Sequence, residues 1–196
     1  MLIDGPSGAL EAQFTTTQAT SLGGVAVLCH PHPQYGGSMH DAVLSCCEES
    51  LLQHGLSCLR FNFRGVGASD GTFDHGQGEV DDVLAAATWA RQAGHGQPLW
   101  LVGYSFGAAM VWQALQRAAP ARAILIAPPI GMMSFADAGD STGKIFALAG
   151  DQDQFVDAQQ FTNWPGVDSR LIAGADHFFN GTFAELQQHL AVVIKQ

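Results

Sequence analysis

Residues 103–107 read Gly-Tyr-Ser-Phe-Gly, a Gly-x-Ser-x-Gly motif whose serine could act as a nucleophile. An apolar run at 98–102 predicts a buried strand before the motif, and residues 108–117 predict a helix after it. A serine between a strand and a helix lies on a tight turn that exposes its hydroxyl, and the two glycines remove Cβ atoms that would clash there. The first N–H groups of the helix favour negative charge beside Ser105. The segment therefore predicts Ser105 as a nucleophile.

A serine hydroxyl is a poor nucleophile at neutral pH and needs a base, which in turn needs a carboxylate to fix its tautomer. Loops that follow parallel strands open at the same edge of a sheet, so residues far apart in the sequence can meet there. After Ser105 the chain supplies Asp151 and Asp153 behind an apolar run, and then His177 behind the next run. The order Ser, Asp, His predicts His177 as the base for Ser105.

Two aspartates could orient His177. Asp151 lies next to the end of the predicted strand, where its side chain can brace the turn, while Asp153 lies farther into the loop. Asp side chains commonly bond their own loop backbone, which favours the bracing role for Asp151. We therefore predict Asp153 as the carboxylate partner of His177, and Asp157 as the cap of a helix that follows.

Short apolar runs alternate with helical patterns along most of the chain. This alternation predicts a single α/β domain over residues 1–196, with a doubly wound, mostly parallel sheet covered by helices on both faces. Two early segments, 2–3 and 9–17, could be antiparallel edge strands, and 128–143 a loop or short helix. The predicted strands are 25–29, 57–63, 98–102, 123–127, 145–149 and 167–173, and the predicted helices are 39–53, 80–93, 108–117 and 182–194.

The composition excludes several classes of protein. Hydrophobic residues make up 47% of the 196 positions and charged residues 13%, which is typical of one globular domain with a sizeable core. The formal net charge of −10, with eight Lys and Arg, argues against a nucleic-acid partner. No apolar run reaches the length of about 18 residues that predicts a membrane span, and the first residues do not resemble a signal peptide. We expect core cysteines in a cytoplasmic protein, because none forms a zinc or redox motif: Cys29, Cys46, Cys47 and Cys58.

Four motifs in this order resemble those of the small serine α/β-hydrolases without a large lid domain, a group that includes esterase-like and dienelactone hydrolase-like proteins. They are His-Pro-His-Pro at 30–33, Gly-Tyr-Ser-Phe-Gly at 103–107, Gly-x-x-Asp-x-x-Val at 150–156 and Asp-His-Phe-Phe at 176–179, and the Arg-Gly-x-Gly-x-Ser loop at 64–69 is also similar. The resemblance implies a sheet of seven or eight strands and hydrolysis of an ester or similar acyl compound without a cofactor. It also implies Ser105, Asp153 and His177 as the catalytic residues.

The resemblance further implies two backbone N–H groups that bind an oxyanion. One comes from the residue after the serine, Phe106, and the other from the loop after the first parallel strand. The family usually has His-Gly-x in that loop, where this chain has His-Pro-His at 30–32, and proline has no N–H to donate. His32 is therefore predicted as the second donor, with Gln34 and Tyr35 as alternatives.

Other polar residues have two interpretations each. A group of His and Asp residues at 30–41 could form a metal site, but interleaved prolines make convergence awkward, and we predict no metal. The members of that group would be His30, His32, His40 and Asp41. Arg64 could contact an anionic substrate or, as we prefer, hold neighbouring loops together. The remaining histidines lie in helical or glycine-rich segments and are expected to be solvated: His40, His54, His75, His95 and His189.

Apolar side chains on the same loops predict a pocket for a small acyl substrate. Packing beneath the loops is the other interpretation for each of them. The predicted pocket residues are Tyr35, Met132 and Phe178, with Phe106, Met133 and Phe155 near the mouth. Alternative functions are a peptidase, thioesterase or acyltransferase that uses the same three catalytic residues, and an inactive hydrolase fold that serves as a binding protein. The oligomeric state is not predicted, because edge strands can pair or stay free.

Overall fold

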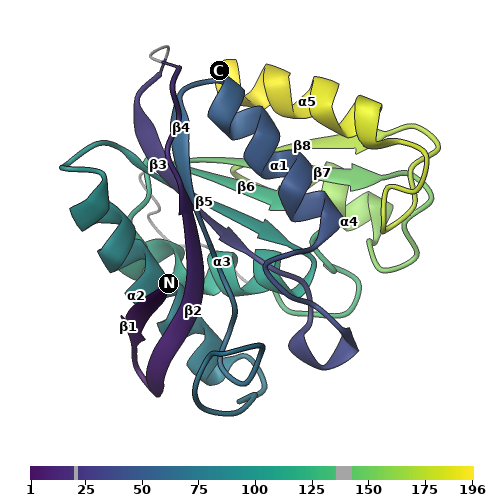
Figure 1. Ribbon diagram of the computed structural model, residues 1–196. Coiled ribbons are helices and arrows are strands. Elements are labelled where there is room, and N and C mark those ends of the chain that lie inside the picture. Colours follow the sequence, from purple (N-terminus) through teal and green to yellow (C-terminus); the bar gives the residue numbers. More distant parts are fainter. Residues whose placement is uncertain (20–21, 136–142) are drawn as a thin grey trace.

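The computed structural model describes residues 1–19, 22–135 and 143–196. Within these ranges, eight strands form one sheet in the order β1-β2-β4-β3-β5-β6-β7-β8 (Figure 1). All pairs from β4 to β8 are parallel, whereas β1 and β2 form an antiparallel edge, which confirms the predicted sheet. The strands span Leu2–Gly5 (β1), Gly8–Thr15 (β2), Gly24–Cys29 (β3), Leu56–Phe61 (β4), Leu99–Tyr104 (β5), Arg122–Ile126 (β6), Lys144–Gly150 (β7) and Val167–Ile172 (β8).

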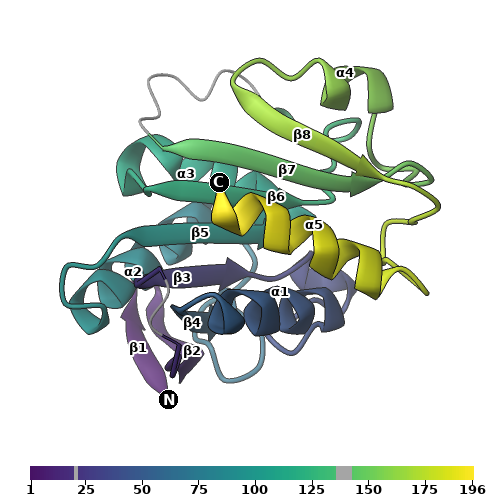
Figure 2. The same ribbon diagram turned by 90° about the horizontal axis from the view of Figure 1, so that it is seen from above.

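Helices cover both faces of the sheet (Figure 2). Helices α1 and α5 pack against each other on one face, and α2 and α3 pack against each other on the opposite face, so an apolar layer lies beneath each pair. None of the helices in the described ranges is long and apolar enough to cross a bilayer. They span Ala42–Gln53 (α1), Gln77–Ala93 (α2), Phe106–Ala118 (α3), Ala158–Thr162 (α4) and Phe183–Lys195 (α5), with a short 3-10 turn at Pro33–Tyr35 (η1).

The burial of each strand follows its position in the sheet. The central strands β3 and β5 are buried along their whole length and are almost entirely apolar. Strand β2, at the antiparallel edge, alternates instead, with Leu10 and Ala12 in the core. A strand covered on both faces is a continuous apolar run, while a strand with one exposed face alternates. Both kinds of strand were therefore predictable from the sequence.

The ends of the predicted elements shift where a side chain caps them. The helix predicted over 39–53 begins at Ala42, because the Asp41 carboxylate accepts two N–H groups of the first turn at 2.8 and 3.3 Å. Of the stretch 128–143, predicted as a loop or short helix, residues 136–142 lie outside the described residues, and the part before them forms turns. Within the described ranges, such shifts leave the order of the predicted strands and helices unchanged.

The direction of the parallel strands brings the candidate residues to one edge of the sheet. Strands β3, β5, β7 and β8 run in the same direction, so the loops that follow them open at a common edge. These four loops carry His32, Ser105, Asp153 and His177 respectively. The fold therefore places these four predicted site residues at the same edge of the sheet.

Candidate active site

Ser105 lies on a turn between β5 and α3 with unusual backbone angles, φ 54° and ψ −118°. Residues other than glycine rarely adopt a positive φ, and they do so where the surrounding structure enforces it. Here the backbone N–H of Ser105 donates to the Ile126 carbonyl of β6 at 2.9 Å, and α3 begins at the next residue. The predicted strand–serine–helix turn is present, and the helix starts two residues earlier than its sequence pattern indicated.

Three side chains form a hydrogen-bonded chain at this edge. Nε2 of His177 lies 2.9 Å from the Ser105 hydroxyl, and Nδ1 of His177 lies 2.7 Å from a carboxylate oxygen of Asp153. The other oxygen of Asp153 accepts the backbone N–H of Phe155 at 2.9 Å, which fixes the orientation of the carboxylate. With its proton on Nδ1, toward the carboxylate, the imidazole presents Nε2 as an acceptor for the serine proton. His177 and Asp153 are both buried, which strengthens these contacts.

The two other loop aspartates have different partners. The exposed Asp151 accepts the backbone N–H of Gly174 at 2.8 Å and so ties the loop after β7 to the loop after β8. Asp157 accepts the N–H groups of Gln159 and Gln160, both at 3.0 Å, and caps α4. Asp153 is the one of the three that reaches His177.

A buried tyrosine connects the nucleophile strand to the histidine loop. The hydroxyl of Tyr104, the residue before the serine, donates to the backbone carbonyl of His177 at 3.0 Å. The two rings also lie 5.6 Å apart between centroids. Burial raises the pKa of the Tyr104 phenol, so this group stays a neutral donor. Tyr104 therefore sets the backbone position of His177 relative to Ser105.

Replacing Tyr104 by Phe is expected to lower kcat about tenfold with little change in KM. The ring and its packing remain, but the imidazole loses the contact that holds its backbone, and small displacements of reacting groups are costly. Steady-state kinetics on a p-nitrophenyl ester measures the effect, and circular dichroism controls for folding. An unchanged kcat in the folded variant would show that the contact has no part in positioning His177.

The first histidine of the 30–41 group is a structural residue. His30 is fully buried, its Nε2 accepts the backbone N–H of Phe63 at 3.0 Å, and its Nδ1 donates to the Pro31 carbonyl at 2.6 Å. Both ring nitrogens are therefore occupied in the neutral tautomer. Among the described residues, no group of three or more His, Cys, Asp or Glu side chains is placed to hold a metal ion. The contacts of His30 instead attach the loop after β3 to the loop after β4.

Acid is expected to destabilise the fold through His30. Burial lowers the pKa of His30 from 6.5 to about 4, so as the pH falls the unfolded chain takes up a proton before the folded protein does. This contribution to stability is complete above the pKa of the unfolded chain and declines toward pH 4, by about 2 kcal/mol between pH 7 and pH 5. Urea unfolding of the wild type and of His30→Gln at both pH values measures it. The variant should lose about 2 kcal/mol less than the wild type, and equal losses would contradict this assignment.

The backbone around His32 separates the three candidate oxyanion donors. The N–H of Gln34 donates to Nδ1 of His32 at 3.2 Å, and the N–H of Tyr35 donates to the His32 carbonyl at 3.1 Å. The N–H groups of His32 and Phe106 have no acceptor among the described residues. The rings of these two residues lie 4.9 Å apart, so their loops are adjacent. His32 and Phe106 are therefore the pair with N–H groups to offer a ligand.

The predicted pocket residues form an exposed rim. Tyr35, Met132 and Phe178 are 86%, 71% and 55% exposed. Phe178 and Phe155 both place a ring edge-on to His177, with centroids 5.3 and 4.7 Å away. Tyr35 lies against the His32 ring, with the centroids 4.6 Å apart. Tyr35 and Phe178 thus lie exposed beside His32 and His177, Met132 is exposed on the turn after β6, and the buried Phe106 ring packs against His32.

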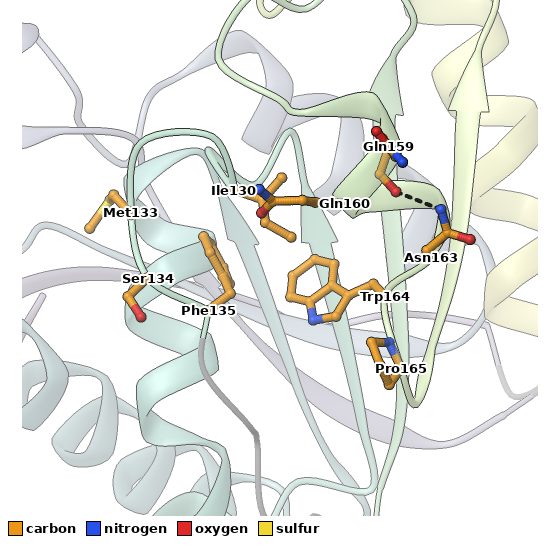
Figure 3. A pocket seen from close by; sticks show the side chains of 9 residues that line it. All are labelled: Ile130, Met133, Ser134, Phe135, Gln159, Gln160, Asn163, Trp164 and Pro165. Atoms are coloured by element: carbon orange, nitrogen blue, oxygen red, sulfur yellow. Dashed lines mark hydrogen bonds between the residues drawn. The ribbon is translucent and has the colours of Figure 1, made fainter.

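A groove on the described surface is lined by none of the three hydrogen-bonded residues; Figure 3 shows its lining. It has a volume of about 600 Å³ and is bounded by the turns before residue 136 and by α4. Met133 lines this groove, but Ser105, Asp153 and His177 do not. The turn that contributes Ile130 and Met133 to this groove is joined to the loop that carries Asp153, because the N–H of Gly131 donates to the Phe155 carbonyl at 3.3 Å. We do not assign it to the candidate active site. Its lining is Ile130, Met133, Ser134, Phe135, Gln159, Gln160, Asn163, Trp164 and Pro165.

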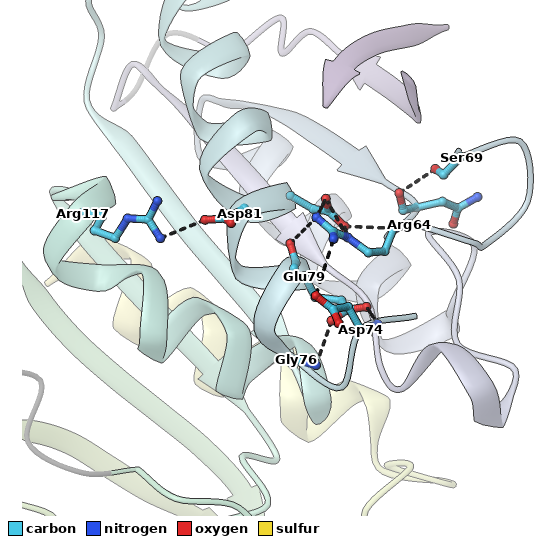
Figure 4. Close-up of polar contacts among 10 residues, drawn as sticks. Arg64, Ser69, Asp74, Gly76, Glu79, Asp81 and Arg117 are labelled. Atoms are coloured by element: carbon cyan, nitrogen blue, oxygen red, sulfur yellow. Dashed lines mark hydrogen bonds and ion pairs between the residues drawn. The ribbon is translucent and has the colours of Figure 1, made fainter. Parts of the chain in front are cut away.

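The arginine of the 64–69 loop has its charge neutralised within the protein (Figure 4). Buried Arg64 binds both oxygens of Asp82, at 2.7 to 3.2 Å, and the Gly78 carbonyl at 2.6 Å. Hydrogen bonds to the Asp82 carboxylate raise the pKa of Arg64 further above its ordinary value. Glu79 accepts the N–H groups of Asp74 and Gly76 beside it. These contacts favour the loop-holding interpretation of Arg64 over substrate binding.

Comparison with known proteins establishes the family. A family model described as alpha/beta hydrolase fold matches residues 27–140, and the chain belongs to this family. An uncharacterized protein of Rickettsia prowazekii is 35% identical over 192 residues, which cover 90% of this chain and 80% of that protein.

Two solved structures add the finer class. A Xanthomonas campestris protein described as an α/β serine hydrolase without a lid is 34% identical, with a TM-score of 0.93 over 100% of this chain and 92% of that chain. A serine hydrolase homologue from Coxiella burnetii is 36% identical, with a TM-score of 0.91 over 97% and 94% of the two chains. The protein is thus similar to α/β serine hydrolases, one of them described as lacking a lid, which supports a hydrolase activity.

Proposed function

We propose that this protein is a serine esterase that hydrolyses a carboxylic ester or similar small acyl compound through an acyl-enzyme. The observation that carries the proposal is the hydrogen-bonded chain from Ser105 through His177 to Asp153, with contacts of 2.9 and 2.7 Å. This is the arrangement that a serine needs to become a nucleophile at neutral pH.

In the proposed mechanism, the Ser105 hydroxyl attacks the substrate carbonyl while Nε2 of His177 takes its proton. Asp153 stabilises the imidazolium that forms, and the N–H groups of Phe106 and His32 donate to the oxyanion of the tetrahedral intermediate. Each such donor contributes about 3 kcal/mol in comparable sites. The imidazolium then returns the proton to the departing alcohol, and an acyl-Ser105 ester remains. Water, deprotonated by His177, attacks this ester by the same steps and releases the acid. No step uses a cofactor.

The exposed rim supports a small or well-exposed substrate. Tyr35, Met132 and Phe178 are largely exposed, and Tyr35 and Phe178 lie against His32 and His177. We propose that they contact the acyl or alcohol group of the substrate. A cytoplasmic location is part of the proposal, and the four buried cysteines, none in a disulfide, support it.

A panel of acyl compounds tests the proposed reaction. The wild type should hydrolyse p-nitrophenyl esters, with rates that fall as the acyl chain outgrows the site, and the same preparation of Ser105→Ala should not. Acyl-CoA thioesters and aminoacyl arylamides in the same panel separate a thioesterase and a peptidase from an esterase. Faster turnover of either comparator than of every ester would overturn the assignment to esters.

A further inference from the structure

We propose that the site accepts uncharged and cationic acyl compounds and rejects those with a carboxylate or phosphate near the scissile carbonyl. The inference rests on the proposed function, and it specifies the substrate class for the same site. It follows from where the protein places its few positive charges and what surrounds Ser105 instead.

All eight Lys and Arg residues of the chain lie within the described ranges. Five of them lie toward the edge of the sheet opposite the site, in the last turns of helices or at the first residues of strands. The sixth, Arg170 in β8, is bonded to the Asp168 carboxylate and to the side chain of the C-terminal residue. At this distance their fields at Ser105 are screened by salt. The six are Arg91, Arg117, Arg122, Lys144, Arg170 and Lys195.

The other two cations lie nearer to the site but are already paired. Arg64 is buried and binds the Asp82 carboxylate and a backbone carbonyl. Arg60 is buried beneath α1, where it contacts Glu48 at 3.1 Å. Turning either guanidinium toward a substrate would leave a buried carboxylate without its partner, which is strongly unfavourable. Neither is therefore available to an anion at Ser105.

The loops that carry the site residues also carry carboxylates. Asp151 and Asp176 lie on the two loops that carry the catalytic carboxylate and imidazole, and Asp41 caps α1 at the same edge. Burial, and after it the charges of Asp41, Asp153 and Asp176, raise the pKa of the Tyr104 phenol, which hydrogen-bonds the His177 carbonyl. An anionic substrate would approach carboxylates from several sides, and like charges at a binding site cost affinity.

The remaining contacts offer an anion no compensation. Aromatic rings line both sides, with Phe155 and Phe178 against His177 and with Phe73 and Tyr35 against His32. The free N–H groups of His32 and Phe106 are committed to the oxyanion in the proposed mechanism. A carboxylate placed against these rings would find no donor from the protein, whereas an ammonium group can bind both to ring faces and to nearby carboxylates.

Three p-nitrophenyl esters test the proposal. Their acyl chains have equal length and end in a methyl, a carboxylate or a trimethylammonium group. With the wild-type enzyme near pH 8 and at low salt, each kcat/KM is divided by the rate of alkaline hydrolysis of that ester. The anionic ester should be at least about tenfold poorer than the neutral ester, and the cationic ester equal to it or better. In about 0.5 M NaCl the differences should shrink several-fold, because salt screens charges at the exposed rim.

A pair of charge-matched variants locates the effect. Asp176→Asn removes one negative charge beside the site and should reduce the discrimination against the anionic ester about two- to fivefold. The loop should keep its structure, because the Asn oxygen can still accept the Phe178 N–H that Asp176 accepts now. Asp168→Asn, which removes the same charge from β8, should leave it unchanged. Equal or faster hydrolysis of the anionic ester by the wild type overturns the inference while leaving the esterase proposal intact. Inactivity of the folded enzyme toward all three esters overturns both.

Discussion

Asp153→Asn is expected to lower kcat/KM for esters about 10⁴-fold. The carboxylate now accepts the Nδ1 proton of His177 at 2.7 Å, and an amide placed there favours the opposite tautomer. Nε2 would then carry a proton and could not accept another from Ser105. The variant should still fold, because the Asn oxygen can accept the Phe155 N–H that holds the loop. Hydrolysis of p-nitrophenyl acetate measures the loss.

Asp151→Asn is the matched control. It removes the same charge from the same loop, and its oxygen can still accept the Gly174 N–H, so its kcat/KM should stay within about threefold of the wild type. Similar losses in the two variants would mean that the loop, rather than the contact with His177, is what activity needs. A larger loss in Asp151→Asn would mean that Asp151, rather than Asp153, is the carboxylate that supports His177.

Gly107→Ala is expected to destabilise the protein by about 4 kcal/mol or more. A Cβ atom at this position would lie 2.2 Å from the carbonyl oxygen of Cys29 and 2.7 Å from that of His30. Both are backbone atoms at the end of β3, so no side chain can turn away to make room. The start of α3 would have to separate from the sheet and carry Ser105 with it. Urea unfolding followed by tryptophan fluorescence measures the change.

Gly131→Ala gives the comparison for that substitution. Its Cβ would keep 3.3 Å or more from the nearest atoms, so we expect a loss of about 1 kcal/mol or less. Neither glycine has a positive φ, which leaves the steric contact as the main difference. A Gly107→Ala protein as stable as Gly131→Ala would show that the close approach of α3 to β3 is not required.

Much of the fold was predictable because the faces that an element buries determine which of its positions are apolar. Fully covered strands such as β5 are continuous apolar runs, whereas β2, which pairs with β1 and β4 near the antiparallel edge, alternates. The candidate site was predictable in outline for a related reason. The loops that follow parallel strands lie at one edge of the sheet. The order of Ser105, Asp153 and His177 in the chain was therefore enough to expect that they lie close together at this edge.

The parts that the sequence did not predict depend on long-range contacts. Tyr104 and His177 are 73 residues apart, and nothing in the spacing of either marks their hydrogen bond. The contact of His30 with Phe63 is similar, since it joins the ends of two neighbouring strands. Phe73 lies beside the site through its contact with His32, but its surrounding sequence has no periodic pattern. A sequence pattern indicates which face of a helix or strand is buried. It does not indicate which distant residue packs against that face.

The choice of the second oxyanion donor needed hydrogen-bond partners rather than sequence position. Proline excluded two positions of the loop after β3, which left His32, Gln34 and Tyr35 as candidates. The N–H groups of Gln34 and Tyr35 are engaged by His32 itself. His32 remains our prediction for this role.

The central claim is that His177, held by Asp153, activates the Ser105 hydroxyl. Covalent labelling by a fluorophosphonate probe, with the modified residue located by mass spectrometry, tests it most directly. We predict rapid labelling of the folded wild type at Ser105, none in Ser105→Ala, and labelling at least about 10²-fold slower in His177→Ala. A folded wild-type protein that resists the probe, or that carries the label on another residue, would contradict it.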